Sequence, residues 1–160
     1  IDSGVSVGMT LNWTSRYYAA PRDIALIDRT ASDIAAIQSA FNADYDGARQ
    51  AAGAGADLVW SPTTSESDLL AFVNGAHRAL LVENEEMDST DITNALMAAA
   101  RRGVNVEICM TDYSDWSAAF GELTSAGVHL AVYSPAASLY INAKVLVRDA
   151  GTSPQRQFFG

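Results

Sequence analysis

Three polar side chains near the end of the chain are spaced so that two of them could meet one phosphate. Asn142 and Lys144 are two residues apart, and Asp149 follows five residues later in an otherwise apolar segment. Residues two apart on a β-strand face the same side, so Asn142 and Lys144 would both point at one ligand. Tyr140 shares that face, and we expect it to contact the substrate. The alternative is an ordinary half-buried strand whose lysine reaches solvent.

This segment resembles the phospholipase D family, whose members carry His-x-Lys-x4-Asp on a strand with apolar flanks. Lys144 and Asp149 stand at the family spacing, and Asn142 stands in the place of the His. The segment 157–160 stands where the family's second Gly-Ser-x-Asn element would begin.

The beginning of the chain resembles the same family's first motif. Asp2 matches the Asp of that motif, and the residues that follow it form a turn and a short apolar strand. The stretch from Gly8 to Asn12 resembles the Gly-Ser-x-Asn element but is one residue longer. The resemblance therefore implies that Thr10 and Asn12 bind substrate and that Asp2 belongs to the catalytic group.

The resemblance implies catalysis without a cofactor or metal. In the family one His attacks phosphorus, a second His protonates the leaving alcohol, the Lys pair neutralises phosphate charge and the Asp residues orient the His rings. A carboxamide neither titrates near neutral pH nor attacks phosphorus, so Asn142 should leave this chain without meaningful turnover. Asn142 is either an engineered substitution or a natural loss. A natural loss would leave a non-catalytic phosphate-binding or structural pseudoenzyme module.

The elements that must position these residues alternate between strands and helices from residue 58 onward. Such alternation predicts an α/β fold, and the resemblance makes it a phospholipase D-like mixed sheet flanked by helices. The predicted strands are Leu58–Trp60, Ala79–Val82, Val104–Met110, Val128–Tyr133 and Leu139–Arg148. The predicted helices begin near Ser67, at Asp88 or Ser89, and at Ser114, and the last two end near Arg102 and Ala126.

The first part of the chain predicts a strand over Arg22–Ile27 and a helix that Ser32 caps, followed by a Gly/Ala-rich linker. By resemblance, residues 1–45 are the C-terminal part of a first lobe, 46–56 the linker and 57–160 a second lobe that lacks its end. We therefore expect the remaining part of the two-lobed protein as a partner, either as further chain or as a second chain. The chain begins without Met or a leader, so we expect a processed or trimmed polypeptide.

Composition narrows the substrate class. The formal net charge of the 160 residues is −9, with only 10 Lys and Arg, and extended nucleic acid requires clustered basic residues. A phospholipid or small phosphodiester is therefore expected instead. The acidic run Glu83–Glu86 could line the cleft and bind a cationic head group, but a solvated turn is the favoured interpretation. The compartment is not determined, and secretion is one alternative.

Overall fold

The computed structural model describes residues 4–15, 18–48, 54–151 and 156–160. The chain divides into two compact units. The hairpin unit comprises the residues up to Met9 together with Ala25–Asp68, and the sheet unit comprises Thr10–Ile24 together with Leu69–Gly160.

The hairpin unit contains an antiparallel strand pair and one helix. Its elements are β1 (Ser6–Met9), β3 (Ala25–Asp28) and α1 (Ala31–Tyr45). Thr30, not Ser32, occupies the N-cap position of α1, because the helix already begins at Ala31 and Ser32 lies in its first turn. The predicted strand over Arg22–Ile27 is wrong as one element, because β2 (Pro21–Arg22) ends there and β3 begins only at Ala25.

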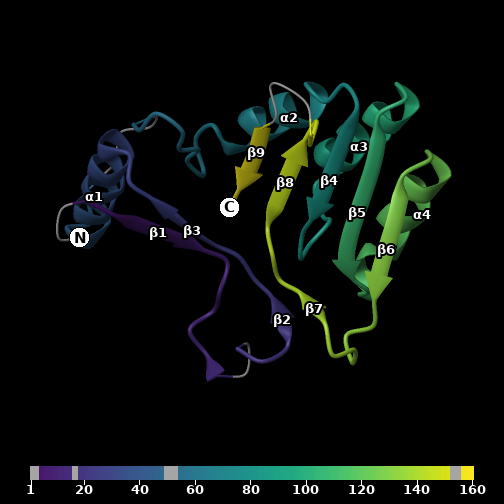
Figure 1. The fold of residues 1–160 in the computed structure, drawn as a ribbon, viewed down its shortest axis with the longest axis horizontal. Coiled ribbons are helices and arrows are strands. Elements are labelled where there is room, and N and C mark those ends of the chain that lie inside the picture. The colour runs from purple at the N-terminus through teal and green to yellow at the C-terminus, as the bar shows by residue number, and fades with distance from the viewer. Residues whose placement is uncertain (1–3, 16–17, 49–53, 152–155) are drawn as a thin grey trace. The chain divides into compact units, whose positions relative to one another are not determined.

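The sheet unit is built on a five-stranded mixed sheet with the order β6-β5-β4-β8-β9 (Figure 1). The first three strands are mutually parallel, whereas β8 and β9 run antiparallel to their neighbours. The strands are β4 (Ala79–Glu83), β5 (Asn105–Thr111), β6 (His129–Tyr133), β8 (Val145–Arg148) and β9 (Arg156–Phe159). The predicted α/β fold with a mixed sheet and helices is confirmed.

The helices of this unit lie against one face of the sheet and form the core with it (Figure 1). They are α2 (Ser65–Asn74), α3 (Thr90–Arg101) and α4 (Ser117–Ser125). Alternate strand residues point toward them, as the two-residue period of a strand requires: Leu80, Val82, Val106, Ile108, Met110 and Leu146. The opposite face contains a hollow of about 720 Å³ whose lining includes Leu81, Cys109, Val145 and Val147.

The residues at the two ends of α3 explain where this helix begins and ends. The Ser89 hydroxyl accepts a hydrogen bond from the Ile92 amide at the beginning of α3. Gly103 follows the end of α3 with a φ of 90°, a left-handed conformation that suits glycine. The predicted helix over Ser114–Ala126 is present as a short 3-10 turn, Ser114–Trp116, followed by α4.

Two predicted strands differ from the structure. Residues 58–60 are not a strand, because the Trp60 carbonyl accepts amides of the turn that leads into α2. The predicted strand Leu139–Arg148 is interrupted. Its first part is β7 (Tyr140–Ile141), which pairs with β2 (Pro21–Arg22), and its second part is β8, which pairs with β4. Asn142–Lys144 lie where the chain changes partner.

In the parts of the chain that the structure describes, no helix is both long enough and apolar enough to cross a bilayer.

Candidate phosphate site between β7 and β8

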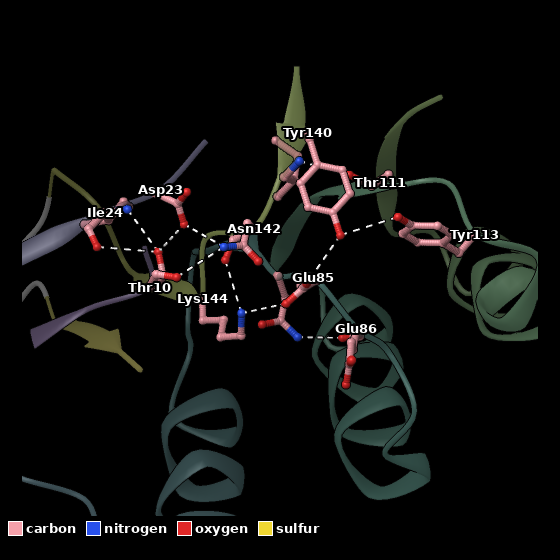
Figure 2. A network of polar contacts seen from close by, with 12 residues as sticks. Thr10, Asp23, Ile24, Glu85, Glu86, Thr111, Tyr113, Tyr140, Asn142 and Lys144 are labelled. Carbon is pink, nitrogen blue, oxygen red and sulfur yellow. Dashed lines mark hydrogen bonds and ion pairs between the residues drawn. The ribbon is translucent and has the colours of Figure 1, made fainter. Parts of the chain in front are cut away.

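The buried amide of Asn142 is the centre of a polar network in the sheet unit (Figure 2). The residue is only 1% exposed. Its Nδ2 donates to the Asp23 carboxylate at 2.8 Å and to the Thr10 carbonyl at 3.1 Å. Its main-chain amide donates to the Arg22 carbonyl at 3.1 Å, which continues the β2–β7 pairing by one residue. The side chain at position 142 is thus fixed by a carboxylate rather than directed into solvent.

Asp23 is the member of this network that sequence reasoning missed. Its Oδ1 accepts from both the Asn142 amide and the Thr10 hydroxyl, the latter at 2.9 Å. It is 119 residues before Asn142 and was part of a predicted strand, so no local spacing pointed to it. Thr10, predicted to bind substrate, also accepts the Ile24 amide at 3.1 Å. Its hydroxyl therefore holds Asp23 in place in this structure.

Lys144 lies beside Asn142, but its ammonium contacts the main chain of that residue. Nζ donates to the Asn142 carbonyl at 3.2 Å and forms an ion pair with Glu85 Oε2 at 2.8 Å. The side chains of Lys144 and Glu85 are 40% and 27% exposed. The favoured interpretation of residues 83–86 as a solvated turn is wrong for Glu85, which belongs to the network.

Two tyrosines complete the network around Glu85 (Figure 2). The Tyr140 hydroxyl donates to Glu85 Oε1 at 3.0 Å and accepts from the Tyr113 hydroxyl at 3.4 Å. The two rings meet edge to face, with centroids 6.3 Å apart. Burial, followed by the hydrogen bonds to Tyr113 and Glu85, raises the pKa of Tyr140 well above its usual range. Tyr140 therefore stays protonated and donates to Glu85.

Asp149 lies at the other end of β8, about 15 Å from Lys144 along the strand. Its carboxylate accepts the main-chain amides of His77, Arg78 and Ala79, with Oδ1 at 3.1, 2.7 and 3.2 Å. Burial opposes ionisation, but these bonds outweigh it and lower the pKa of Asp149. The structure does not bring Asp149 to Asn142, so it does not support an orienting role at that side chain.

Asn12, another predicted site residue, has no described contact with this network. Asn12 is exposed, and its carbonyl accepts the Thr14 amide at 2.8 Å. Asp2 lies outside the described residues. Within the described residues, no three His, Cys, Asp or Glu side chains come together as a metal site would require.

The arrangement places a cation beside position 142, but the side chain at that position is an amide rather than an imidazole. Lys144 supplies the cation, whereas both Nδ2 hydrogens of the buried Asn142 amide are taken by Asp23 and the Thr10 carbonyl. An amide does not attack phosphorus, and the Lys144 ammonium in its ion pair with Glu85 has no lone pair with which to attack it. His77 precedes β4, and His129 begins β6.

The fold is phospholipase D-like. No protein-family model matches this sequence, and no curated protein matches it. Among solved structures, a phospholipase D family member, Nuc from Salmonella typhimurium, matches with a TM-score of 0.50 and 25% identity, over 56% of this chain and 60% of that one. A polyphosphate kinase from Porphyromonas gingivalis matches with a TM-score of 0.67 and 13% identity, over 98% of this chain.

The chain spans 60% and 26% of the lengths of these two proteins. The first is described as a phospholipase D family member and the second as a polyphosphate kinase. At 13% identity the likeness to the kinase shows the fold alone, and this fold also occurs in a phospholipase D family member.

Proposed function

We propose that this chain is part of a phospholipase D-type phosphodiesterase that acts on a phospholipid or small phosphodiester, and that Asn142 makes it inactive. The observation that supports this most directly is the contact between the position-142 side chain and the Asp23 carboxylate at 2.8 Å. A histidine at this position would donate one ring N–H to Asp23 in the same way. The carboxylate would then fix the tautomer and stabilise the imidazolium.

Lys144 fits the role of phosphate ligand in this proposal. Its ammonium is anchored at the Asn142 main chain, so a phosphoryl oxygen bound to Nζ would lie within reach of a ring at position 142. A nitrogen of that ring would attack phosphorus as the bond to the alcohol breaks, and the alcohol would leave with a proton from a second acid. Water would then give a proton back to that acid and attack phosphorus, which breaks the P–N bond, frees the ring and releases a phosphomonoester. The second acid and its lysine are assigned to the remaining part of the two-lobed protein.

A second candidate function is a non-catalytic phosphate-binding module. The observation that favours it is Asn142 itself, whose Nδ2 donates to both the Asp23 carboxylate and the Thr10 carbonyl. In this case the network would bind a phosphodiester and never turn it over.

The test is an Asn142→His substitution in the native polypeptide, whose full extent is first established by intact mass. Hydrolysis of bis(p-nitrophenyl) phosphate and of phosphatidylcholine vesicles is measured for both forms. The proposal expects a gain of at least about 10²-fold, since acid-base assistance alone is typically worth about 10²–10⁴-fold. Asn142→Gln is the matched control and should gain nothing.

An Asp23→Asn change in the Asn142→His background should remove most of the gain. If Asn142→His gains no activity in the complete polypeptide, the catalytic proposal fails. The binding module is then tested by whether Lys144→Ala abolishes binding of dimethyl phosphate.

A further inference from the structure

We propose that Glu85 is a specificity-determining residue, which lets Lys144 bind a singly charged phosphodiester and disfavours doubly charged phosphate. This inference rests on the proposed function, because it assumes that Lys144 binds a phosphoryl group. It adds a residue that the His-x-Lys-x4-Asp spacing does not contain.

Both carboxylate oxygens of Glu85 are held by the network (Figure 2). Oε1 accepts from the Tyr140 hydroxyl at 3.0 Å, and Oε2 pairs with Lys144 Nζ at 2.8 Å. The side chain is 27% exposed, and Tyr113 supports Tyr140 from the other side. Glu85 is therefore fixed beside the ammonium, unlike a mobile surface carboxylate.

Glu85 also limits how many ligand oxygens Lys144 can bind. An ammonium has three N–H donors. Among the residues that the structure describes, one is directed to Glu85 and one to the Asn142 carbonyl, which leaves a third for a single non-bridging oxygen. A phosphodiester needs no more than this, because it carries one negative charge over two such oxygens.

The charges of the side chains around Lys144 lead to the same conclusion. Lys144 and Glu85 together carry no net charge, and the Asp23 carboxylate lies on the far side of the Asn142 amide. A doubly charged ligand gains the same hydrogen bond as a diester but brings one more negative charge next to Glu85. Charges a few ångströms apart in a partly exposed site still repel appreciably, so the dianion is disfavoured.

The experiment compares binding of dimethyl phosphate with that of methyl phosphate, which is largely a dianion at pH 8. Dissociation constants are measured by calorimetry on the native polypeptide, on Glu85→Gln, on Lys144→Ala and on Glu86→Gln. Glu85→Gln keeps an acceptor for Tyr140 and removes the charge. Glu86 is the matched control, because it is exposed and its loss changes the net charge equally.

We expect Glu85→Gln to shift the ratio of the two constants about tenfold in favour of methyl phosphate, which corresponds to about 1.4 kcal/mol. Glu86→Gln should leave the ratio within about twofold of its original value. If Glu85→Gln does not fold, the same ratio is measured with Glu85→Ser, which also removes the charge.

An unchanged ratio in the Glu85 variant, or an equal shift in the Glu86 variant, overturns the role of Glu85 while leaving the phosphate site in place. Two other binding results would overturn the proposed function itself. The first is that neither ligand binds any form of the protein. The second is that Lys144→Ala binds both ligands as well as the native protein does.

Discussion

Replacing Asp149 should destabilise the sheet unit rather than disable chemistry at Asn142. Three main-chain amides, those of residues 77–79, donate to its carboxylate. The residue is 7% exposed and has a φ of 54°, in the left-handed region that favours Gly and Asn. Hydrogen bonds to a charged acceptor contribute about 1.5–3 kcal/mol each, but amides near the surface recover part of that from water.

Three substitutions at Asp149 should lower the free energy of unfolding by different amounts. Asp149→Gly removes the acceptor without backbone strain and should lower the free energy of unfolding by about 2–3 kcal/mol. Asp149→Ala adds a left-handed Cβ and should cost about 1 kcal/mol more. Asp149→Asn keeps one acceptor and tolerates the same φ, so it should cost only about 1 kcal/mol. Asp88→Asn, at an exposed loop residue, is the matched control and should have little effect.

The direction of the Asp149 pKa shift determines how its contribution to stability changes with pH. The pKa of Asp149 is lowered in the folded state, so its contribution to stability is fully present above the unfolded value of about 3.9. That contribution is lost as the pH falls through the lower folded value. The difference in unfolding free energy between native protein and Asp149→Asn should therefore be largest at neutral pH and shrink below about pH 4.

Urea unfolding followed by circular dichroism at several pH values measures both effects. An unfolding free energy of Asp149→Gly equal to that of the native protein would refute the reasoning. So would a loss of the activity gained by Asn142→His in an Asp149→Asn variant of unchanged stability. That second result would return Asp149 to the catalytic role that its motif position implies.

Two further outcomes are expected. A Cβ at Gly75 would meet Nη1 of Arg148, whose guanidinium also bonds the Phe72 carbonyl and lies over its ring. Gly75→Ala should therefore lower the free energy of unfolding, measured in urea, by about 1–2 kcal/mol, and by less in an Arg148→Ala background. An equal loss in both backgrounds would contradict this reasoning. Burial, followed by the Glu83 carboxylate, raises the pKa of the Cys109 thiol. Iodoacetamide at pH 8 should therefore alkylate Cys109 more slowly than it alkylates the thiol of free glutathione. Glu83→Gln should raise that rate, and an unchanged rate would show that Glu83 has no part in it.

Sequence reasoning predicted those elements that have strong periodicity and clear ends. The helix before Gly103 is an example, because Ser89 caps its beginning and a left-handed glycine follows its end. The interruption of Leu139–Arg148 was not predictable in this way. Its apolar residues are consistent with one strand, and the break arises because Arg22, far away in the sequence, pairs with the first part.

The site was predictable only where its residues are close in sequence. Asn142, Lys144 and Tyr140 were named together, and the structure places them in one network. Their partners Asp23 and Glu85 are 119 and 59 residues away from Asn142 and Lys144, respectively, and no single-sequence pattern links such pairs. The roles of these residues in binding and catalysis stay predictions.

The strand order has a consequence for how the sheet unit folds. β4 lies between β5, which follows it after one helix, and β8, which is separated from it by more than sixty residues. During synthesis β4 can pair with β5 early, but its other edge stays open until residues 145–148 have been made. Open strand edges promote association between chains, and late long-range pairing slows folding. Closure of the edge by β8 also brings Lys144 to Glu85, so completing the sheet and assembling the candidate site are one folding event.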